Sequence, residues 1–542
     1  MSELQRPKES FGTRIGVILA VTGSAVGLGN FLRFPGLAAE YGGAFMVPYV
    51  VAFLLLGLPI AISEWGLGRR GGRFGFNSTP GVFHAITNRS RTGAYFGVLG
   101  PLIPVMIYMY YVFVEAWCLG YAWQYLTGGM TEVKTADQSE SFFHVFTGIA
   151  GDGTLFDDPM KNATIFLAIC FALNFYLIYR GLSKGIELFC KIAMPTLIVC
   201  AILVLIRVLT LPVDPAAPDQ TVINGLGYMF NPYTEGRGFW ESLNPRHNSE
   251  MWLAAAGQIF FSLSVGFGII ITYASYLKKD DDIALSSVTA AAGNGFCEVC
   301  LGGLIVIPAA FVMLGPSVVQ NPPGTFGLGF VTLPQVFDAM PLGRWIGFIF
   351  FFLLFLAAAT SSISMLQPAI AFLEESLGVG RRASMAILGF ITVCGAWFVM
   401  YFSAGAKGVD TIDFWIGTVG IYTLATIQVI MFGWVLGIRK GKEEIDRGAE
   451  IPIPFFVLVI VKFISPLYLL AVFGFWAYTN FYANYVDPEK TENTALYALM
   501  HDRTAQFSVG LILLMIVFLV LVISEAVRRW DRLEASQKGA EL

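Results

Sequence analysis

Two short glycine-rich stretches of this chain could expose backbone atoms for ion binding at the middle of a membrane. The motif Val-Gly-x-Gly occurs at residues 26–29 and again at 265–268, each time inside a long hydrophobic segment. Two glycines separated by one residue weaken helix packing and add backbone freedom, so we expect each segment to break there. Exposed backbone at that depth is tolerated only around a protein-lined cavity. Such paired breaks in corresponding halves of a chain indicate a transporter with a substrate and ion site.

The polar side chains near the two breaks are neutral oxygen ligands. Asn30 follows the first break, and Gln258 and Ser262 precede the second. Asn294 and the hydroxyl groups of residues 360–362 lie in two later hydrophobic segments. Small hard cations such as sodium prefer oxygen ligands, and neutral ones bind the ion without burying a further fixed charge. These residues therefore predict a sodium site, although a single amide or hydroxyl could instead hold two membrane helices together.

The elements that must position these residues are membrane-spanning helices. Of the 542 residues, 56% are hydrophobic and 13% are charged, a composition outside the range of soluble domains. About twelve segments are long and apolar enough to cross a bilayer. Their expected spans are 13–40, 43–70, 91–127, 162–180, 187–212, 248–278, 283–315, 341–377, 383–403, 409–438, 453–481 and 504–529. The chain is thus predicted to be an all-α polytopic membrane protein with one transporter domain, residues 1–542, embedded in the lipid bilayer.

Basic residues cluster in alternate loops between these spans. The clusters lie at 6–14, 69–73, 180–184, 278–279, 381–382, 439–442 and 528–532. The positive-inside rule places these loops and both termini in the cytoplasm.

The same sequence gives no sign of other functional classes. The formal net charge of −4 is small for this length and does not indicate a nucleic-acid interface. The four histidines are scattered, and the common catalytic motifs are absent, so nothing argues for an enzyme. No obligate protein partner is evident.

Long motifs make the chain resemble the neurotransmitter:sodium symporter family, and most closely its bacterial amino-acid branch. The matching segments include residues 23–35, 111–120, 257–276, 360–373 and 413–418. The resemblance implies a LeuT-like fold, in which helices 1–5 and 6–10 form two inverted repeats and helices 1 and 6 are broken. The repeats would occupy residues 11–212 and 247–438, followed by two additional helices within 453–530. It also implies sodium-coupled symport by alternating access in a bacterial inner membrane.

By this resemblance, two sodium ions would be bound. The ligands of the first would be the Ala25 carbonyl, the side chains of Asn30, Ser262 and Asn294, and the carboxylate of the substrate. The ligands of the second would be the carbonyls of Gly23, Val26 and Ala357 and the hydroxyls of Thr360 and Ser361. Because the protein ligands of the first site are neutral, a substrate carboxylate would complete its coordination and charge. Ion and substrate binding would then be interdependent.

The resemblance also assigns a substrate pocket. Its residues would be Ala25, Leu28, Gly29, Ile107, Tyr111, Phe261, Ser262, Ser264, Phe267, Ser361 and Met365. Family members that carry monoamines have an aspartate where this chain has Gly27, so an amino acid with its own carboxylate is expected here. The expected pocket holds no charged group, which favours a neutral, apolar amino acid. Small aliphatic and larger hydrophobic side chains both remain open, as does another zwitterion such as a betaine-like osmolyte.

Charged residues at the two ends of the expected pathway resemble gates. Arg33 and Asp413 would form the outer gate, beneath which Tyr111 and Phe261 would form an aromatic lid. Lys8 and Glu375 would form the inner gate, with Arg6 as an alternative to Lys8.

Glu298, Glu64 and Glu115 are acidic residues in the interior of the expected spans. Glu298 follows Asn294 by one helical turn, where chloride-dependent relatives lack a carboxylate and bind chloride nearby. It therefore predicts transport without chloride, with its protonation linked to return of the empty carrier; a purely structural acid is the alternative. Glu64 is expected to pair with amides freed at a helix break, whereas no role for Glu115 follows from the sequence.

An ion channel and a sensor that does not transport are the alternatives to a transporter. An ion channel needs a continuous pore, whereas the paired breaks with Arg33 and Asp413 indicate occlusion. A sensor that does not transport would be expected to carry a signalling domain, for which the short tails leave no room.

Overall fold

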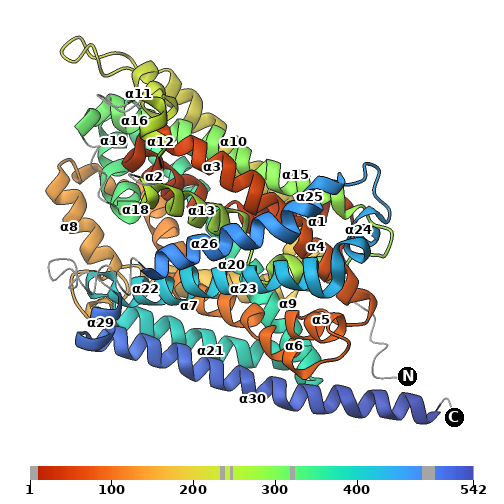
Figure 1. Cartoon of the computed structure of the whole chain (residues 1–542). Helices are drawn as coiled ribbons and strands as arrows, with labels where there is room; N and C mark the ends of the chain where they lie inside the picture. Colours follow the sequence, from red (N-terminus) through yellow and green to blue (C-terminus); the bar gives the residue numbers. More distant parts are fainter. Residues whose placement is uncertain (1–9, 232–237, 245–247, 318–323, 479–494, 541–542) are drawn as a thin grey trace.

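Helices occupy all twelve of the segments expected to cross the membrane (Figure 1). The computed structural model describes residues 10–231, 238–244, 248–317, 324–478 and 495–540, and these contain no β-strand. The all-α prediction is therefore confirmed for the described chain.

The elements follow one another closely along the sequence. Up to residue 209 they are α1 (Arg14–Ala25), η1 (Gly29–Arg33), α2 (Phe34–Tyr41), η2 (Gly42–Phe45), α3 (Met46–Ala52), η3 (Phe53–Gly57), α4 (Leu58–Arg73), α5 (Thr79–Ile86), α6 (Arg91–Phe96), α7 (Leu99–Thr127), η4 (Gly129–Glu132), α8 (Ala136–Thr147), η5 (Thr154–Phe156), α9 (Thr164–Tyr179), η6 (Leu182–Glu187) and α10 (Leu188–Leu209). From there to residue 437 they are α11 (Val222–Phe230), α12 (Phe239–Leu243), α13 (Ser249–Leu263), α14 (Ile269–Ser275), α15 (Ile283–Gly295), η7 (Phe296–Gly303), α16 (Leu304–Leu314), α18 (Gly324–Gly327), η8 (Leu328–Thr332), α19 (Leu333–Ala339), α20 (Gly343–Leu377), α21 (Arg381–Tyr401), η9 (Ala404–Ala406), α22 (Lys407–Ile412), η10 (Asp413–Gly420), α23 (Ile421–Ile430) and η11 (Met431–Gly437). The last are α24 (Ile438–Asp446), α25 (Phe455–Val459), η12 (Ile460–Ile464), α26 (Ser465–Ala477), α29 (Ala495–His501) and α30 (Arg503–Ala540).

By length and composition alone, nine helical stretches of the described residues could cross a membrane. The difference from the twelve expected segments has a local cause. The breaks divide the first and sixth segments, and α9 in the fourth is only 16 residues long. The second half of the first segment runs on into the second, as one stretch from Gly29 to Arg73.

The two broken segments run in opposite directions and meet at their breaks. The first begins at Arg14, whose guanidinium forms an ion pair with Asp282 (3.2 Å), just after the end of the second. At the breaks, the Ser264 hydroxyl donates to the Ser24 carbonyl (2.9 Å). This antiparallel pairing is what inverted repeats require. The repeat boundaries themselves, 11–212 and 247–438, stay predictions.

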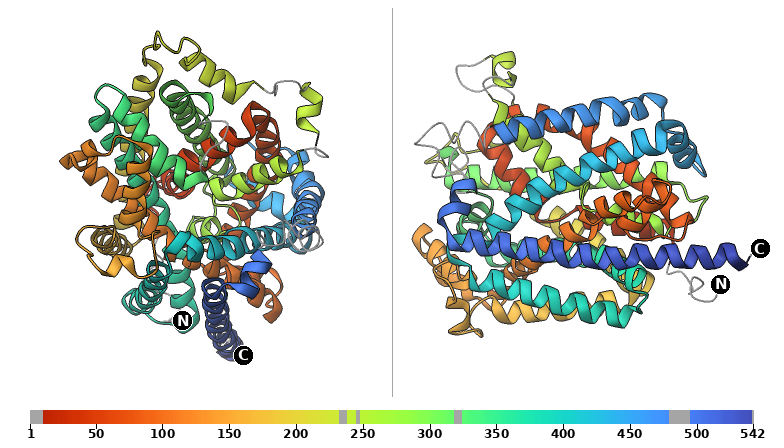
Figure 2. Two further views of the ribbon diagram at one scale, coloured as in Figure 1. Left: turned by 90° about the vertical axis from the view of Figure 1, so that its left-hand side faces the viewer. Right: turned by 60° about the horizontal axis from the view of Figure 1, so that its bottom comes forward.

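Two long helices form the centre of the bundle and support the broken pair. α7 and α20 make the most extensive contact between any two elements, and both are apolar on nearly all sides, as expected of buried helices. Both end at a glycine with positive φ, Gly128 and Gly378, a common helix stop. Figure 2 shows the longest helix, α30, running along the outside of the bundle.

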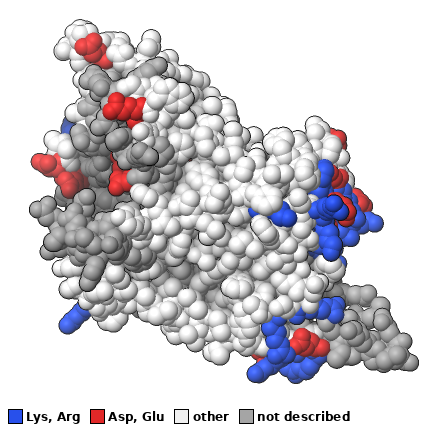
Figure 3. Space-filling view, in the orientation of Figure 1, with Lys and Arg blue, Asp and Glu red and all other residues white. Residues whose placement is uncertain are grey.

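Basic residues gather at one end of the bundle. In Figure 3, Lys and Arg side chains lie near α24 and the C-terminal part of α30, while the middle of the surface is largely uncharged. Ion pairs join basic loops that are far apart in sequence, such as Arg69 at the end of α4 with Glu444 in α24 (3.0 Å). The prediction that the basic loops share one side is therefore supported by the structure.

At this basic end, Glu187 holds the start of α1. Its carboxylate accepts hydrogen bonds from the Gly12 N–H (2.7 Å), the Thr13 hydroxyl (3.0 Å) and the Lys191 ammonium (2.7 Å). Gly16 leaves the space that this carboxylate fills. A hydrogen bond to a charged group contributes about 1.5–3 kcal/mol to stability. The bonds from Gly12 and Thr13 to Glu187 therefore stabilise the packing of the start of α1 against α10.

We expect Glu187→Ala to release the start of α1 and expose Cys190. This thiol is buried beside Gly23 of α1, so its reaction with a water-soluble maleimide should become about tenfold faster. The rate is measured by mass spectrometry, with Cys190→Ser to identify the reacting residue. Glu443→Ala, at an exposed position of α24, is the matched control. Equal rates in all variants that retain Cys190 would contradict this role.

Candidate functional site

The first break is stabilised by side chains that replace helical hydrogen bonds. α1 ends at Ala25, the backbone becomes extended at Val26, and the helix resumes beyond Gly27. The Gly27 N–H donates to Asn30 Oδ1 (2.9 Å), and the Leu28 N–H donates to the Tyr111 hydroxyl oxygen (3.2 Å). Backbone amides freed at mid-membrane thus find buried partners, as they must in the absence of water.

The second break is built from residues with positive φ. Ser264 (53°), Gly266 (78°) and Gly268 (76°) all take this conformation between α13 and α14. The freed Gly266 N–H donates to Glu64 Oε1 (2.9 Å). The expectation that Glu64 pairs with an amide at a helix break is confirmed.

Gly268 combines positive φ with close packing, because an added Cβ would lie 2.8 Å from Gly100 Cα and 2.9 Å from its carbonyl oxygen. We expect Gly268→Ala to destabilise the protein by about 1–3 kcal/mol. Thermal unfolding in detergent measures this effect. Gly510→Ala in α30, where a Cβ meets nothing within 4 Å, is expected to leave the unfolding temperature unchanged or higher. A similar unfolding temperature for the two variants would contradict the argument.

A directed chain of hydrogen bonds connects the first break to a buried acid. It passes from the Gly27 N–H to Asn30, from Asn30 Nδ2 to Asn294 Oδ1 (2.9 Å), and from Asn294 Nδ2 to Ser262 Oγ (2.6 Å). The Ser262 hydroxyl then donates to Glu298 Oε2 (2.7 Å). Its direction is set by the backbone N–H, which can only donate.

Within this chain, Asn294 Oδ1 also faces two other acceptors. The Ala25 and Ser262 carbonyl oxygens each lie 3.2 Å from the position that Oδ1 occupies. Turning the Asn294 amide would relieve these contacts but would place its nitrogen against that of Asn30. A cation among the three oxygens relieves them without breaking the chain, and amide oxygens keep a second lone pair for it. The donor set therefore fits a sodium ion.

Part of the second predicted ion group also comes together, with one contact between α20 and α1. The Ser361 hydroxyl lies 3.5 Å from the Gly23 carbonyl oxygen and 3.1 Å from that of Ala357. The Thr360 hydroxyl lies 3.0 Å from the same Ala357 oxygen. Val26 is adjacent at the end of α1, and its N–H donates to the Thr22 carbonyl (2.7 Å).

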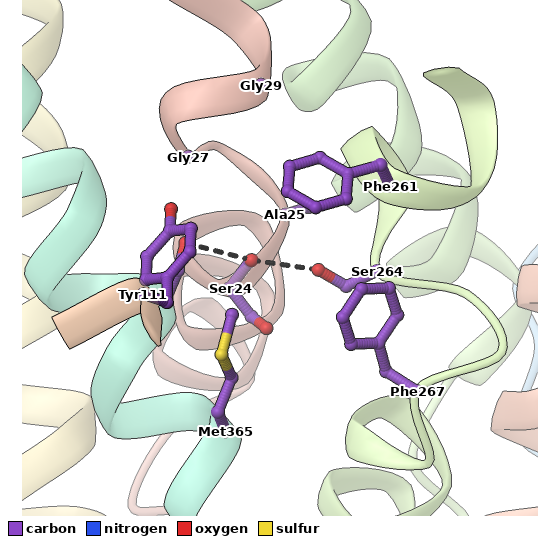
Figure 4. Close-up of a pocket in the computed structure, with 10 residues that line it drawn as sticks. Ser24, Ala25, Gly27, Gly29, Tyr111, Phe261, Ser264, Phe267 and Met365 are labelled. Carbon is purple, nitrogen blue, oxygen red and sulfur yellow. Dashed lines mark hydrogen bonds between the residues drawn. The ribbon is translucent and has the colours of Figure 1, made fainter. Parts of the chain in front are cut away.

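A small pocket lies between the two breaks and α7 and α20 (Figure 4). Figure 4 shows Tyr111 on one side of the Ser24 carbonyl, Phe261 and Phe267 on the other, and Met365 below it. The cavity volume is about 10 Å³, which is about the room that one water molecule needs. The lining residues are Ser24, Ala25, Gly27, Gly29, Tyr111, Phe261, Ser264, Phe267, Ser361 and Met365. An amino acid would fit only after these side chains move apart.

Most predicted substrate residues line this pocket, and three do not. Leu28 and Ile107 are buried but are not part of the lining, and Ser262 belongs to the hydrogen-bond chain instead. Ser24, which the predicted set omits, is in the lining and accepts hydrogen bonds from Ser264 and Ser361. Ser24 contributes to the pocket through its backbone carbonyl oxygen. The identity of the side chain in the sequence gives no sign of this contribution.

The outer-gate residues contact other side chains in the described part of the chain rather than pairing with each other. The Arg33 guanidinium carbon lies 5.1 Å from the centre of the Phe261 ring. Asp413 Oδ1 accepts a hydrogen bond from the Tyr110 hydroxyl (2.6 Å). An ion pair between Arg33 and Asp413 would require movement, and the gate assignment stays a prediction.

The inner gate is only partly within the described residues. Lys8 and its alternative Arg6 lie outside them. Glu375 accepts hydrogen bonds from the N–H groups of Asn77 (2.7 Å) and Ser78 (3.1 Å), just before α5. The pairing of Glu375 with Lys8 is therefore untested.

Glu298 receives two hydrogen bonds that were not expected. The Tyr49 hydroxyl donates to Oε2 (2.6 Å), and Gln258 Nε2 donates to Oε1 and also to the Gly29 carbonyl (3.3 Å). The hydroxyl of a tyrosine buried in an apolar span usually needs a hydrogen-bond partner. This feature of the sequence could have indicated a polar contact for Tyr49.

The structure also gives Glu115 a contact. Asn174 Nδ2 of α9 donates to Glu115 Oε2 (3.0 Å) and to the Tyr108 hydroxyl (3.4 Å). Glu115 therefore joins α7 to α9 and is not among the residues that line the pocket.

Comparison with known proteins identifies chains of similar sequence and structure. The model of the sodium:neurotransmitter symporter family matches residues 8–142 and 136–524. A sodium-dependent transporter of Methanocaldococcus jannaschii is 29% identical over 87% of this chain and 90% of its own. The sodium-dependent transporter YhdH of Bacillus subtilis is 28% identical over 87% and 98%, respectively. A crystal structure of MhsT in complex with L-phenylalanine has a TM-score of 0.72 and 30% identity, covering 86% of this chain and 99% of that one.

Proposed function

The chain belongs to the sodium:neurotransmitter symporter family, and we propose that it imports a neutral, apolar amino acid with sodium by alternating access, without chloride. Its family and fold are those of secondary transporters and not of enzymes. The observation that carries the proposal is that Ala25 belongs both to the pocket and to the oxygens around Asn294. A substrate carboxylate bound in the pocket would therefore lie beside a sodium ion.

Two sodium ions are proposed. The first would be bound by the Ala25 carbonyl, the side chains of Asn30, Ser262 and Asn294, and the substrate carboxylate. The second would be bound by the carbonyls of Gly23, Val26 and Ala357 and the hydroxyls of Thr360 and Ser361. Both groups draw ligands from α1, so binding of either ion favours the conformation in which α1 stays in place.

The pocket chemistry favours an apolar substrate side chain. Phe261, Phe267 and Met365 supply its apolar surface, and no charged side chain is among its lining residues. A charged side chain on the substrate would therefore be buried without a partner. The phenylalanine bound in the similar MhsT structure is consistent with this class.

Independence of chloride is proposed from the position of Glu298. Its carboxylate accepts from Ser262, a proposed ligand of the first ion, so it can supply a fixed negative charge next to the bound sodium. The Tyr49 and Gln258 donors hold it there.

Alternating access is proposed to open the pocket at either end in turn. Arg33 and Asp413 would gate the outer end, with Tyr111 and Phe261 as the lid. The end rich in basic residues would face the cytoplasm of a bacterial cell, together with both termini.

The proposal is tested by thermal unfolding of the detergent-purified protein with each of the twenty amino acids, in sodium and in potassium buffer. A ligand that binds only the folded state stabilises it by about 2.7 kcal/mol at a hundredfold excess over its dissociation constant. We expect shifts only with neutral, apolar amino acids and only in sodium.

The other results separate the parts of the proposal. Equal shifts in both buffers would refute sodium coupling. If no amino acid gives a shift, betaines are tested in the same two buffers; a sodium-dependent shift with a betaine would replace the substrate by an osmolyte while keeping the coupled site.

A further inference from the structure

Lys462 is a lysine within a segment that is otherwise apolar and long enough to cross the membrane. It lies in η12, inside the candidate span Phe455–Ala477. It is half-buried and follows the first residue of the span by seven positions. That corresponds to a depth of about 10 Å along a helix.

Aromatic side chains surround its ammonium group. Lys462 Nζ lies 5.0 Å from the ring centre of Trp434 and 5.4 Å from that of Phe463. The Trp434 indole also donates to the Lys462 carbonyl (2.9 Å), which fixes the ring against η12. Gly433 permits this approach, because its missing Cβ would lie 3.2 Å from Lys462 Cα. We call these three side chains, Trp434, Lys462 and Phe463, the Lys462 surface.

The Lys462 surface faces outward from the bundle. Trp434 and Phe463 are 58% and 52% exposed, and the neighbouring Leu467 is 70% exposed. In a membrane-spanning segment such exposed apolar side chains contact lipid.

No acidic side chain among the described residues forms an ion pair with Lys462. A cation at this depth is unfavourable unless an anion approaches it or its side chain reaches the interface. Aromatic rings compensate for only part of the lost hydration. A positive charge therefore stays at a lipid-facing position, and no anion of the described part of the chain neutralises it.

From this geometry we propose that the Lys462 surface binds the phosphate headgroup of an anionic phospholipid. A lysine side chain at this depth can reach the interface, where lipid phosphates lie, and Trp434 and Phe463 would then contact the upper part of the acyl chains. The exposed Arg439 and Lys440 follow Trp434 in the chain, at the start of α24, and add positive charge on the same side. This site is independent of the pocket and of the transported substrate.

Native mass spectrometry of the full-length protein tests this site. The protein is released from nanodiscs that contain equal amounts of phosphatidylglycerol and phosphatidylcholine. Both lipids carry a phosphate, but only the first has a net negative charge. We expect the wild type to retain phosphatidylglycerol preferentially, and Lys462→Met to reduce this preference about fivefold. Lys462→Arg should restore it.

The matched control is Lys184→Met, at an exposed position of η6 at the same end of the bundle. It should keep the lipid preference of the wild type. Unchanged unfolding temperature would show that Lys462→Met still folds. Equal preference in wild type and Lys462→Met, or an equal loss in Lys184→Met, would overturn the proposal. A dimer mass that disappears in Lys462→Met without a change in lipid would also overturn it, in favour of a second copy of the chain.

Discussion

Gly27→Ala is expected to weaken substrate binding by about 10- to 100-fold and to abolish most sodium-driven uptake. An added Cβ would lie 2.8 Å from the Tyr111 hydroxyl oxygen and 3.0 Å from Ser361 Oγ. Overpacking of this kind costs about 1–3 kcal/mol, and in this pocket the methyl group would also occupy the room for the substrate. Uptake of the amino acid identified by the stability screen, measured in proteoliposomes with a sodium gradient, checks the result.

The matched control for this prediction is Gly36→Ala in α2. There an added Cβ would meet its nearest atoms only at 3.9–4.0 Å, from Thr325 and Leu328. It should transport at close to the wild-type rate. Wild-type uptake by Gly27→Ala would mean that the substrate does not bind between Tyr111 and Ser361.

Glu298→Ser is expected to make transport depend on chloride. The substitution removes a buried negative charge but leaves the Tyr49, Gln258 and Ser262 donors directed at its place. Without an anion, the first sodium ion would be bound less favourably, and we expect roughly tenfold lower uptake, or about 1.4 kcal/mol. Chloride could occupy the space between these donors and restore most of the activity.

Uptake is compared in sodium chloride and in sodium gluconate. Wild type should transport equally well in both, whereas Glu298→Ser should transport roughly tenfold more slowly in gluconate than in chloride. Adding Tyr49→Phe to Glu298→Ser removes one donor and should reduce the chloride effect. A large loss of wild-type uptake in gluconate would show that Glu298 does not replace chloride.

Local sequence features were sufficient to predict the breaks and the residues near them. The paired glycines at 26–29 and 265–268 indicate where a helix loses its packing, and an amide such as Asn30 in an apolar segment needs a buried partner. Hydropathy predicts the membrane-spanning segments because every one of them must be apolar to lie in the lipid bilayer. Each of these signals depends on a few neighbouring residues, so it can be recognised in a single sequence.

Contacts between distant helices could not be predicted in the same way. Tyr110 donates a hydrogen bond to Asp413 because α7 packs against η10. Asn174 donates one to Glu115 because α7 also packs against α9. Hydropathy does not encode which helix faces which. The Ser24 carbonyl is a further example, since any residue at that position would present the same oxygen.

The Ser24 carbonyl oxygen connects α1 to the second break and to α20. It accepts from Ser264 at the second break and from Ser361 in α20, while belonging to α1 itself. A displacement of α1 away from both partners therefore has to break both hydrogen bonds. We expect a carbonyl oxygen shared in this way to favour two discrete positions of α1 over intermediate ones. A carrier built on it would spend little time with its pathway half open, which limits the leak of sodium without substrate.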